Sequence, residues 1–186
     1  MARVLIPLAQ GCEELEAVTV IDILRRAGIE VITAGLANGP VRASRGTVLV
    51  PDMTLDAALQ HDYDMIVLPG GMPGSEHLKN DNRIIGLLQR MAAAGKYVAA
   101  ICAAPMTLHA AGLLEGKHAT SFPGVLDRLP GSHIYLNDAV VVDGRVVTSR
   151  GPGTAMDFAL TLVELLMSKA KRASVEAELE RPTQIH

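Results

Sequence analysis

Residues 97–112, with the sequence YVAAICAAPMTLHAAG, decide the fold. The first six positions are apolar or small throughout, a pattern typical of a strand that is buried on both faces. The remainder predicts a helix over 103–112, with Gly112 as its left-handed cap. The sequence DMIVLPGG at 64–71 is a second continuous apolar run, and it ends in glycines. Such strands favour a mainly parallel sheet with helices on both faces.

The rest of the chain alternates in the same way between short runs rich in Val and Ile and helical patterns. The predicted elements are strands at 3–9 and 29–37, helices at 13–28, 80–96 and 152–170, an excursion hairpin at 38–52 with its turn at Arg45-Gly46, and a hairpin at 139–149 around Asp143-Gly144. No linker or repeat divides the sequence. We therefore expect a single α/β domain over residues 1–186, doubly wound, with a small β-hairpin excursion.

Composition argues against several classes of protein. Of the 186 residues, 49% are hydrophobic, which is enough for a sizeable core. The net charge is −3 and aromatic residues make up 3%, so basic patches and stacking side chains for a nucleic acid are lacking. No stretch approaches the ~20 apolar residues of a membrane span. Two cysteines cannot form a disulfide framework. We expect a cytoplasmic protein without a nucleic-acid or membrane partner.

Three loops of unusual composition follow predicted strands: QGCEELE at 10–16, PGGMPG at 69–74 and CAAP at 102–105. In a parallel sheet, ligands bind in the loops outside the carboxyl ends of the strands. We therefore expect the functional site at these three loops.

Cys102 lies at the predicted junction of a strand and a helix. Ala100 and Ala104 leave room around it, as in a nucleophile elbow, where small neighbours keep a sharp turn free of clashes. The start of a helix also favours the thiolate and lowers the pKa of a thiol. The alternative is an inert cysteine packed in the core, which is a common place for this residue type. Both interpretations remain open at this point.

The other two loops carry glycines and carboxylates. Gly70 and Gly71 could aim backbone N–H groups at an oxyanion near the thiol, or could only form a turn. The glutamates at the start of the predicted helix could simply complement the helix dipole. On a helical projection, however, Glu13 points toward the apolar face and Glu16 toward its edge. A carboxyl buried there would keep its proton and could donate a hydrogen bond or transfer a proton. The projection favours Glu13.

The six histidines show no spacing typical of metal ligands, and two cysteines are too few for a zinc knuckle. There is no phosphate-binding loop and no dinucleotide fingerprint. His109 could serve as a base for Cys102, although a packing or surface role is the simpler interpretation. The sequence therefore predicts neither a metal nor a cofactor.

Together these segments resemble the DJ-one/ThiJ/PfpI superfamily, and within it the DJ-one and bacterial YajL branch. The segments that match in order and spacing, from residue 3 to about 170, are GCEELEAV, DILRRAGIEV, SRGTVLVPD, DMIVLPGG, AAICAAP, ATSFP and TSRGPGTAMDFAL. The resemblance implies a flavodoxin-like homodimer. It also implies that Cys102 is an easily oxidised nucleophile, and that a protonated Glu16, rather than Glu13, donates a hydrogen bond to its sulfur.

By the same resemblance, Gly70, Gly71 and the backbone of Ala103 match the groups that bind an anion around this thiol. Arg45 matches an arginine that reaches the site near the dimer interface. The resemblance also implies that the sequence RGPG, which begins at Arg150, lies beside Arg45.

Three residues bear on the choice between possible functions. Proteases and related hydrolases of the superfamily have a histidine directly after the nucleophile, where this chain has Ala103, so a cysteine protease or amidase is disfavoured. Phe122 stands where one branch has a histidine, which removes any mechanism that depends on that side chain. Cys12 lies in the loop that carries Glu16, and it could act as a resolving thiol for Cys102 or be a small filler residue.

Two functions then fit the sequence. The first is a cofactor-free, thiol-dependent glyoxalase or deglycase, in which Cys102 adds to methylglyoxal, glyoxal or their early adducts with amines or thiols. The second is a redox-sensing protective protein or chaperone, whose central event is oxidation of Cys102 to a sulfinic acid. Both functions use the same site, and the sequence does not separate them.

Overall fold

The computed structural model describes residues 1–181. Residues 182–186, which the single-domain prediction includes, lie outside the described residues. The strands of the central sheet are β1 (Arg3–Leu8), β2 (Glu30–Gly35), β5 (Met53–Thr54), β6 (Met65–Leu68), β7 (Tyr97–Ile101), β10 (Val140–Asp143) and β11 (Val146–Ser149).

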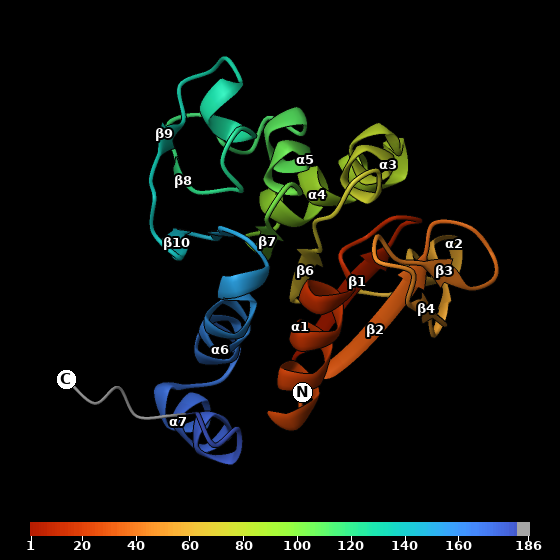
Figure 1. Cartoon of the computed structure of the whole chain (residues 1–186), viewed down its shortest axis with the longest axis vertical. Coiled ribbons are helices and arrows are strands. Elements are labelled where there is room, and N and C mark those ends of the chain that lie inside the picture. Colours follow the sequence, from red (N-terminus) through yellow and green to blue (C-terminus); the bar gives the residue numbers. More distant parts are fainter. Residues whose placement is uncertain (182–186) are drawn as a thin grey trace.

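Within residues 1–181, the sheet has seven strands in the order β10-β11-β7-β6-β1-β2-β5 (Figure 1). Neighbouring strands are parallel, except for β10 and β11, which form an antiparallel hairpin at one edge. The predicted α/β class, with a mostly parallel and doubly wound sheet of flavodoxin-like type, is confirmed.

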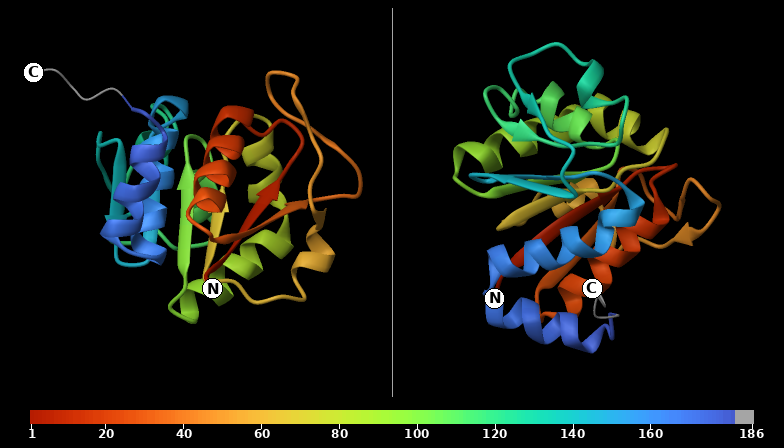
Figure 2. Two further views of the ribbon diagram at one scale, coloured as in Figure 1. Left: turned by 90° about the horizontal axis from the view of Figure 1, so that it is seen from below. Right: turned by 60° about the vertical axis from the view of Figure 1, so that its left-hand side comes forward.

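Helices cover both faces of this sheet, as Figure 2 shows. One face carries α1 (Glu14–Arg26) and α6 (Ala155–Leu166), which pack against each other, and α7 (Lys169–Glu178), which packs on α6. The other face carries α2 (Leu55–Ala58), α3 (Gly74–Asn80), α4 (Asn82–Ala93) and α5 (Pro105–Ala110).

The central strands contribute to both cores. In β1, Val4 and Ile6 join the core under α1 and α6, whereas Leu5 joins the core on the opposite face. In β6, Val67 and Leu68 divide between the two cores in the same way. Because neither face meets water, apolar residues occupy successive positions of these strands, which is the pattern seen in the sequence.

The carboxyl-terminal part departs from the predicted helix at 152–170. Residues Pro152–Thr154 form a 3-10 turn, and the chain then divides into α6 and α7 with a break at Met167. The side chain of Ser168 accepts the N–H of Lys171 at 3.1 Å and begins α7 as its N-cap. The break therefore has a local chemical cause, which the continuous helical pattern hides. Among residues 1–181, no helix is long and apolar enough to cross a bilayer.

The predicted hairpin at 38–52 is present as β3 (Val41–Arg42) and β4 (Val48–Leu49), an antiparallel pair apart from the main sheet. The elements that the sequence did not predict are short: β5, α2, α3, and the parallel pair β8 (His118–Ala119) and β9 (Ile134–Tyr135), which flanks the 3-10 turn Leu126–Arg128. Two-residue strands are too short to show a period, so their absence from the prediction has a simple reason.

The three loops singled out in the sequence come together at one edge of the sheet. They follow β1, β6 and β7, which are neighbours, and the carboxyl ends of parallel neighbours lie side by side. Backbone hydrogen bonds join the first two loops, since Glu13 N–H donates to Gly70 O at 2.8 Å and Gly74 N–H to Gly11 O at 3.3 Å.

Candidate active site

Cys102 directly follows β7 and has a left-handed backbone, with φ of 65°. This conformation is uncommon for a residue with a Cβ and costs on the order of 1 kcal/mol. Two hydrogen bonds hold it: Cys102 N–H donates to Ser149 O at 2.9 Å, and Cys102 O accepts the N–H of Phe122 at 2.8 Å. Ala100 and Ala104 are both fully buried beside the turn. The local geometry is that of a nucleophile elbow, with the cysteine 9% exposed at the carboxyl edge of the sheet.

Glu16 lies in the first turn of α1 and is fully buried. Its Oε2 accepts the N–H of Gly70 at 2.8 Å, and the carboxyl interacts with the Cys102 thiol. Oε1 makes no well-aligned hydrogen bond within residues 1–181. A buried oxygen without a donor is costly when it carries charge, so this environment favours the protonated acid.

The two groups titrate as a pair. Burial raises the pKa of Glu16 to about 7, although hydrogen bonds from Cys102 and Gly70 act against it. Burial, followed by the charge of Glu16, raises the pKa of Cys102 to about 12, and the N–H groups of Gly71 and Ala103 act in the opposite direction. One proton therefore leaves the pair near pH 7 and the second is held to far higher pH.

The expectation that the helix start lowers the pKa of Cys102 is wrong for this structure. The helix α5 begins three residues later, at Pro105, and is short. Loss of solvent around the sulfur, together with the adjacent carboxylate, outweighs its dipole.

Two glycines permit this close approach. A Cβ on Gly70 would lie 2.6 Å from both Cys102 Cβ and Glu16 Oε2, so any other residue would force the pair apart. Gly71 has φ of 89°, and a Cβ there would collide with the backbone nitrogen of Glu13. The predicted anion-binding role of Gly70 needs correction, because its N–H is donated to Glu16 Oε2. The N–H groups directed at the sulfur are those of Gly71 and Ala103.

Glu13 occupies a different place from the one that the helical projection gives it. The helix begins at Glu14, so Glu13 is the N-cap residue with an extended backbone, and the projection does not apply to it. Its Oε2 accepts the Ser44 hydroxyl at 2.9 Å, and its side chain also accepts the N–H of Leu15. Glu13 lines the cavity described below, whereas Glu16 is the carboxyl that lies against Cys102.

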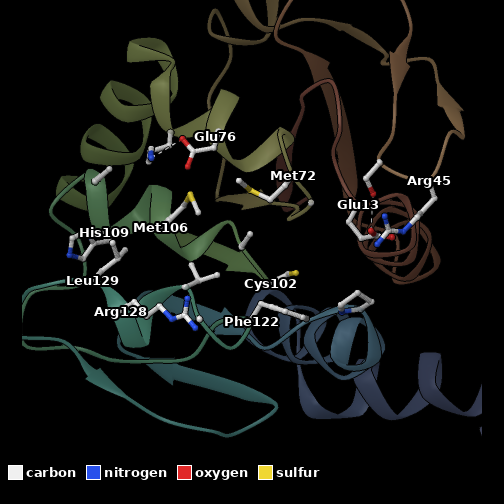
Figure 3. Close-up of a pocket in the computed structure, with 18 residues that line it drawn as sticks. Glu13, Arg45, Met72, Glu76, Cys102, Met106, His109, Phe122, Arg128 and Leu129 are labelled. Atoms are coloured by element: carbon white, nitrogen blue, oxygen red, sulfur yellow. Dashed lines mark hydrogen bonds and ion pairs between the residues drawn. The ribbon is translucent and has the colours of Figure 1, made fainter.

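A cavity of about 750 Å³ opens over Cys102 (Figure 3). Glu13 and Arg45 lie at one end of it, and His109, Arg128 and Leu129 lie at the other. The remaining lining side chains include Met72, Met106 and Phe122.

Met72, Met106 and Arg128 also line the cavity and were not predicted from the sequence. They belong to three segments that only the tertiary fold brings together. The one local signal was proximity: Met106 is four residues beyond Cys102, and Met72 directly follows the glycine pair.

The remaining predicted residues divide into those at the cavity and those away from it. Arg45 and Phe122 line it, and Phe122 is 48% exposed. Arg150 does not, since its Nη1 donates to Asn137 Oδ1 at 2.9 Å. Cys12 is fully buried, and burial raises the pKa of its thiol to about 11. Both cysteines are free thiols.

No cluster of three or more His, Cys, Asp or Glu side chains in the described part of the chain could hold a metal ion.

Comparison with known proteins identifies the family of the chain. A model of the DJ-1/PfpI family matches residues 2–165. The chain belongs to this family. Relatives within the DJ-1/PfpI family include the Parkinson disease protein 7 homolog of Danio rerio, 44% identical over 181 residues, which cover 95% of this chain and 96% of that protein. The Protein DJ-1 homolog B of Arabidopsis thaliana is also 44% identical over 91% of this chain, which spans only 39% of that longer protein.

Two further members of the family are similar to this chain over most of their length. A Caenorhabditis elegans protein named glutathione-independent glyoxalase DJR-1.2 is 38% identical over 175 residues, which cover 94% of this chain and 92% of that protein. The crystal structure of Drosophila melanogaster DJ-1beta superposes with a TM-score of 0.94 at 40% identity, covering 98% of this chain and 99% of that one. The DJ-1/PfpI fold therefore extends over nearly all of the chain.

Replacing Glu16 by glutamine should flatten the pH dependence of stability. The pKa of Glu16 is about 7 in the folded chain against an ordinary value of 4.5, so the folded state holds this proton more tightly than the unfolded state. The stabilisation is complete below pH 4.5 and is lost as the pH rises through 7. At about 1.4 kcal/mol for each pH unit between these values, the loss reaches about 3 kcal/mol.

Urea denaturation at about pH 5 and about pH 8 measures this difference for the wild type and for Glu16→Gln. The exposed Glu178→Gln on α7 is the matched control and should follow the wild type. Equal losses of unfolding free energy in the wild type and Glu16→Gln would contradict the assignment.

Proposed function

We propose that this chain is a cofactor-free, thiol-dependent glyoxalase that converts 2-oxoaldehydes such as methylglyoxal and glyoxal into 2-hydroxy acids. The observation that carries the proposal is the contact between Cys102, on its strained elbow, and the buried carboxyl of Glu16, whose pKa is about 7. A group that titrates near neutrality can both take up and release a proton during one catalytic cycle. The name of the Caenorhabditis elegans relative supports the same chemistry.

The first step is addition of the Cys102 sulfur to the aldehyde carbon. The pair carries one negative charge above neutrality, and that charge is reactive when it lies on the sulfur while Glu16 keeps the proton. The aldehyde oxygen becomes an oxyanion, and Glu16 then gives its proton to this oxygen, which leaves a neutral hemithioacetal and the Glu16 carboxylate. The N–H groups of Gly71 and Ala103, which face the sulfur, are the donors placed to stabilise the oxyanion.

The second step moves hydrogen between the two substrate carbons. Glu16 as carboxylate takes the proton from the former aldehyde carbon and returns it to the neighbouring carbon, while the hydroxyl proton of the hemithioacetal moves to the former ketone oxygen. The product at this stage is a thioester of Cys102, and water then cleaves it to free the thiol. The aldehyde carbon is oxidised and the ketone carbon is reduced by the same amount, so the sum is methylglyoxal plus water giving lactate. We propose that early adducts of these aldehydes with amines or thiols react at the same thiol.

A second candidate function is redox sensing through Cys102. Two oxygen atoms from peroxide would convert the thiolate to a sulfinic acid, releasing water. The specific observation in its favour is the protonated, buried Glu16, which can donate a hydrogen bond to a sulfinate oxygen.

His109 gives no support to a protease, because its Nε2 lies 2.6 Å from Pro130 O and is engaged there instead of at Cys102.

Exposed apolar side chains support a homodimer, which we also propose. Leu15 and Val18 on α1 are exposed, as are Val48 and Val50 in the segment 38–52, which contacts the start of α1 through the hydrogen bond from Arg45 N–H to Glu14. Exposed apolar side chains that gather in one region of a surface are typical of an association site. Sedimentation equilibrium should give the mass of two chains, and Val50→Asp should shift the equilibrium toward one chain. Val142→Asp, on β10, is the control for an exposed valine elsewhere. A wild-type mass of one chain would overturn the dimer.

The glyoxalase proposal predicts that lactate formation from methylglyoxal depends on Cys102. Cys102→Ser should lose at least about 100-fold in kcat/KM, because serine at neutral pH is a far weaker nucleophile than a thiolate. Cys12→Ser replaces the other buried thiol and should stay within about twofold of the wild type. Full activity in Cys102→Ser would overturn the mechanism. If the wild type forms no lactate, the redox function leads, and peroxide should then add two oxygen atoms to Cys102 by mass spectrometry.

A further inference from the structure

The cavity is larger than the substrates named above require. Methylglyoxal has three carbons, whereas a volume of about 750 Å³ lies in the range of pockets that hold drug-sized ligands. Away from Cys102, the walls are apolar and come from Met106, Ala110, Val125 and Leu129. Such a surface fits a carbon chain attached to the reacting carbonyl rather than a bare three-carbon molecule.

Charged groups are distributed unequally along this cavity. At one end, Arg45 lies beside the carboxylate of Glu13, which offers a nearby opposite charge although no ion pair joins the two within residues 1–181. At the other end, Glu76 is neutralised by Lys79, whose Nζ lies 2.8 Å from Glu76 Oε2. Arg128 lies on the same side of Cys102 and, within residues 1–181, has no carboxylate within ion-pair distance. Its guanidinium is therefore the charge in this half of the cavity that lacks a counterion.

Arg128 is held in place through the segment that begins at Phe122. Phe122 N–H donates to Cys102 O. Gly124 follows two residues after Phe122, and the Arg128 guanidinium packs over it, since a Cβ on Gly124 would lie 3.5 Å from Arg128 Cζ. In Figure 3 the guanidinium points along the cavity toward Phe122.

Two histidines fix the turn that carries Arg128. The Nε2 atom of His109 contacts Pro130 O at 2.6 Å, and Nε2 of His133 contacts Leu126 O at 2.9 Å. The two rings also pack edge to face, with centroids 5.5 Å apart. The backbone on both sides of Arg128 is thus anchored, which lowers the entropy cost of binding a ligand there.

We propose that Arg128 binds the anionic end of an extended substrate whose 2-oxoaldehyde group lies at Cys102. A guanidinium without a counterion pairs with a carboxylate or a phosphate through two parallel hydrogen bonds. The substrate class is therefore a 2-oxoaldehyde with a short carbon chain that ends in a carboxylate or phosphate. The inference rests on the proposed glyoxalase function and gives its specificity. The reaction balances as before: the 2-oxoaldehyde and water yield the 2-hydroxy acid, and the anionic end is unchanged.

The test compares substrates that share the reacting group and differ at the far end. They are 4,5-dioxopentanoate, with a carboxylate; hydroxypyruvaldehyde phosphate, with a phosphate; and 2-oxohexanal, which is neutral and of similar length. The wild type should prefer an anionic substrate over 2-oxohexanal by at least about tenfold in kcat/KM, mainly through KM. Arg128→Gln should remove this preference, Arg128→Lys should retain part of it, and turnover of 2-oxohexanal should stay unchanged. Arg90→Gln, an exposed charge outside the cavity, is the control.

A second readout does not depend on turnover. 2-Hydroxyglutarate, the product of 4,5-dioxopentanoate, should protect Cys102 from alkylation by iodoacetamide in the wild type but not in Arg128→Gln.

A preference for the carboxylate or for the phosphate substrate identifies the natural terminus. Turnover of all three aldehydes at equal efficiency, or an equal loss for all three in Arg128→Gln, would overturn the inference and leave the glyoxalase intact. Absence of turnover with protection that depends on Arg128 would overturn the glyoxalase and support the anion site.

Discussion

The buried carboxyl of Glu16 is the constraint on which the site depends. It accepts the N–H of Gly70 in the loop after β6 and lies against Cys102 at the end of β7, so α1 and two central strands meet at one group. Gly70 is the residue that fits between the two side chains. Because a second charge in this space would be strongly unfavourable, the carboxyl and the thiol hold one proton between them at neutral pH.

Much of the fold could be predicted from the sequence because burial on both faces leaves a clear mark. The runs at 64–71 and 97–102 are continuous and apolar, and they became the central strands β6 and β7. Elements set by tertiary contacts left no such mark. The strands β5, β8 and β9 are two residues long, and the pattern at 152–170 hid the break before Ser168.

The site was predictable to the extent that its chemistry is local. The elbow at Cys102 follows from small neighbours at a strand end. The choice between Glu13 and Glu16 depended on where α1 begins, and a shift of one residue turns a side chain to another side of the helix. The pKa of Cys102 depends on solvent exclusion by distant segments, and Arg128 reaches the cavity from a turn far along the chain. Neither is visible in a local pattern.

The rate of Cys102 alkylation by iodoacetamide as a function of pH tests the shared proton most directly. In the wild type the rate should rise with the first titration of the pair near pH 7, below the ordinary thiol value of 9.0. A fraction of the singly charged pair carries its charge on the sulfur, even though the pKa of Cys102 itself is raised. In Glu16→Gln the thiol must lose its own proton in a buried site, so the rise should move above that ordinary value. The same pH profile in both proteins, or a wild-type thiol that reacts only in alkaline solution, would contradict the account.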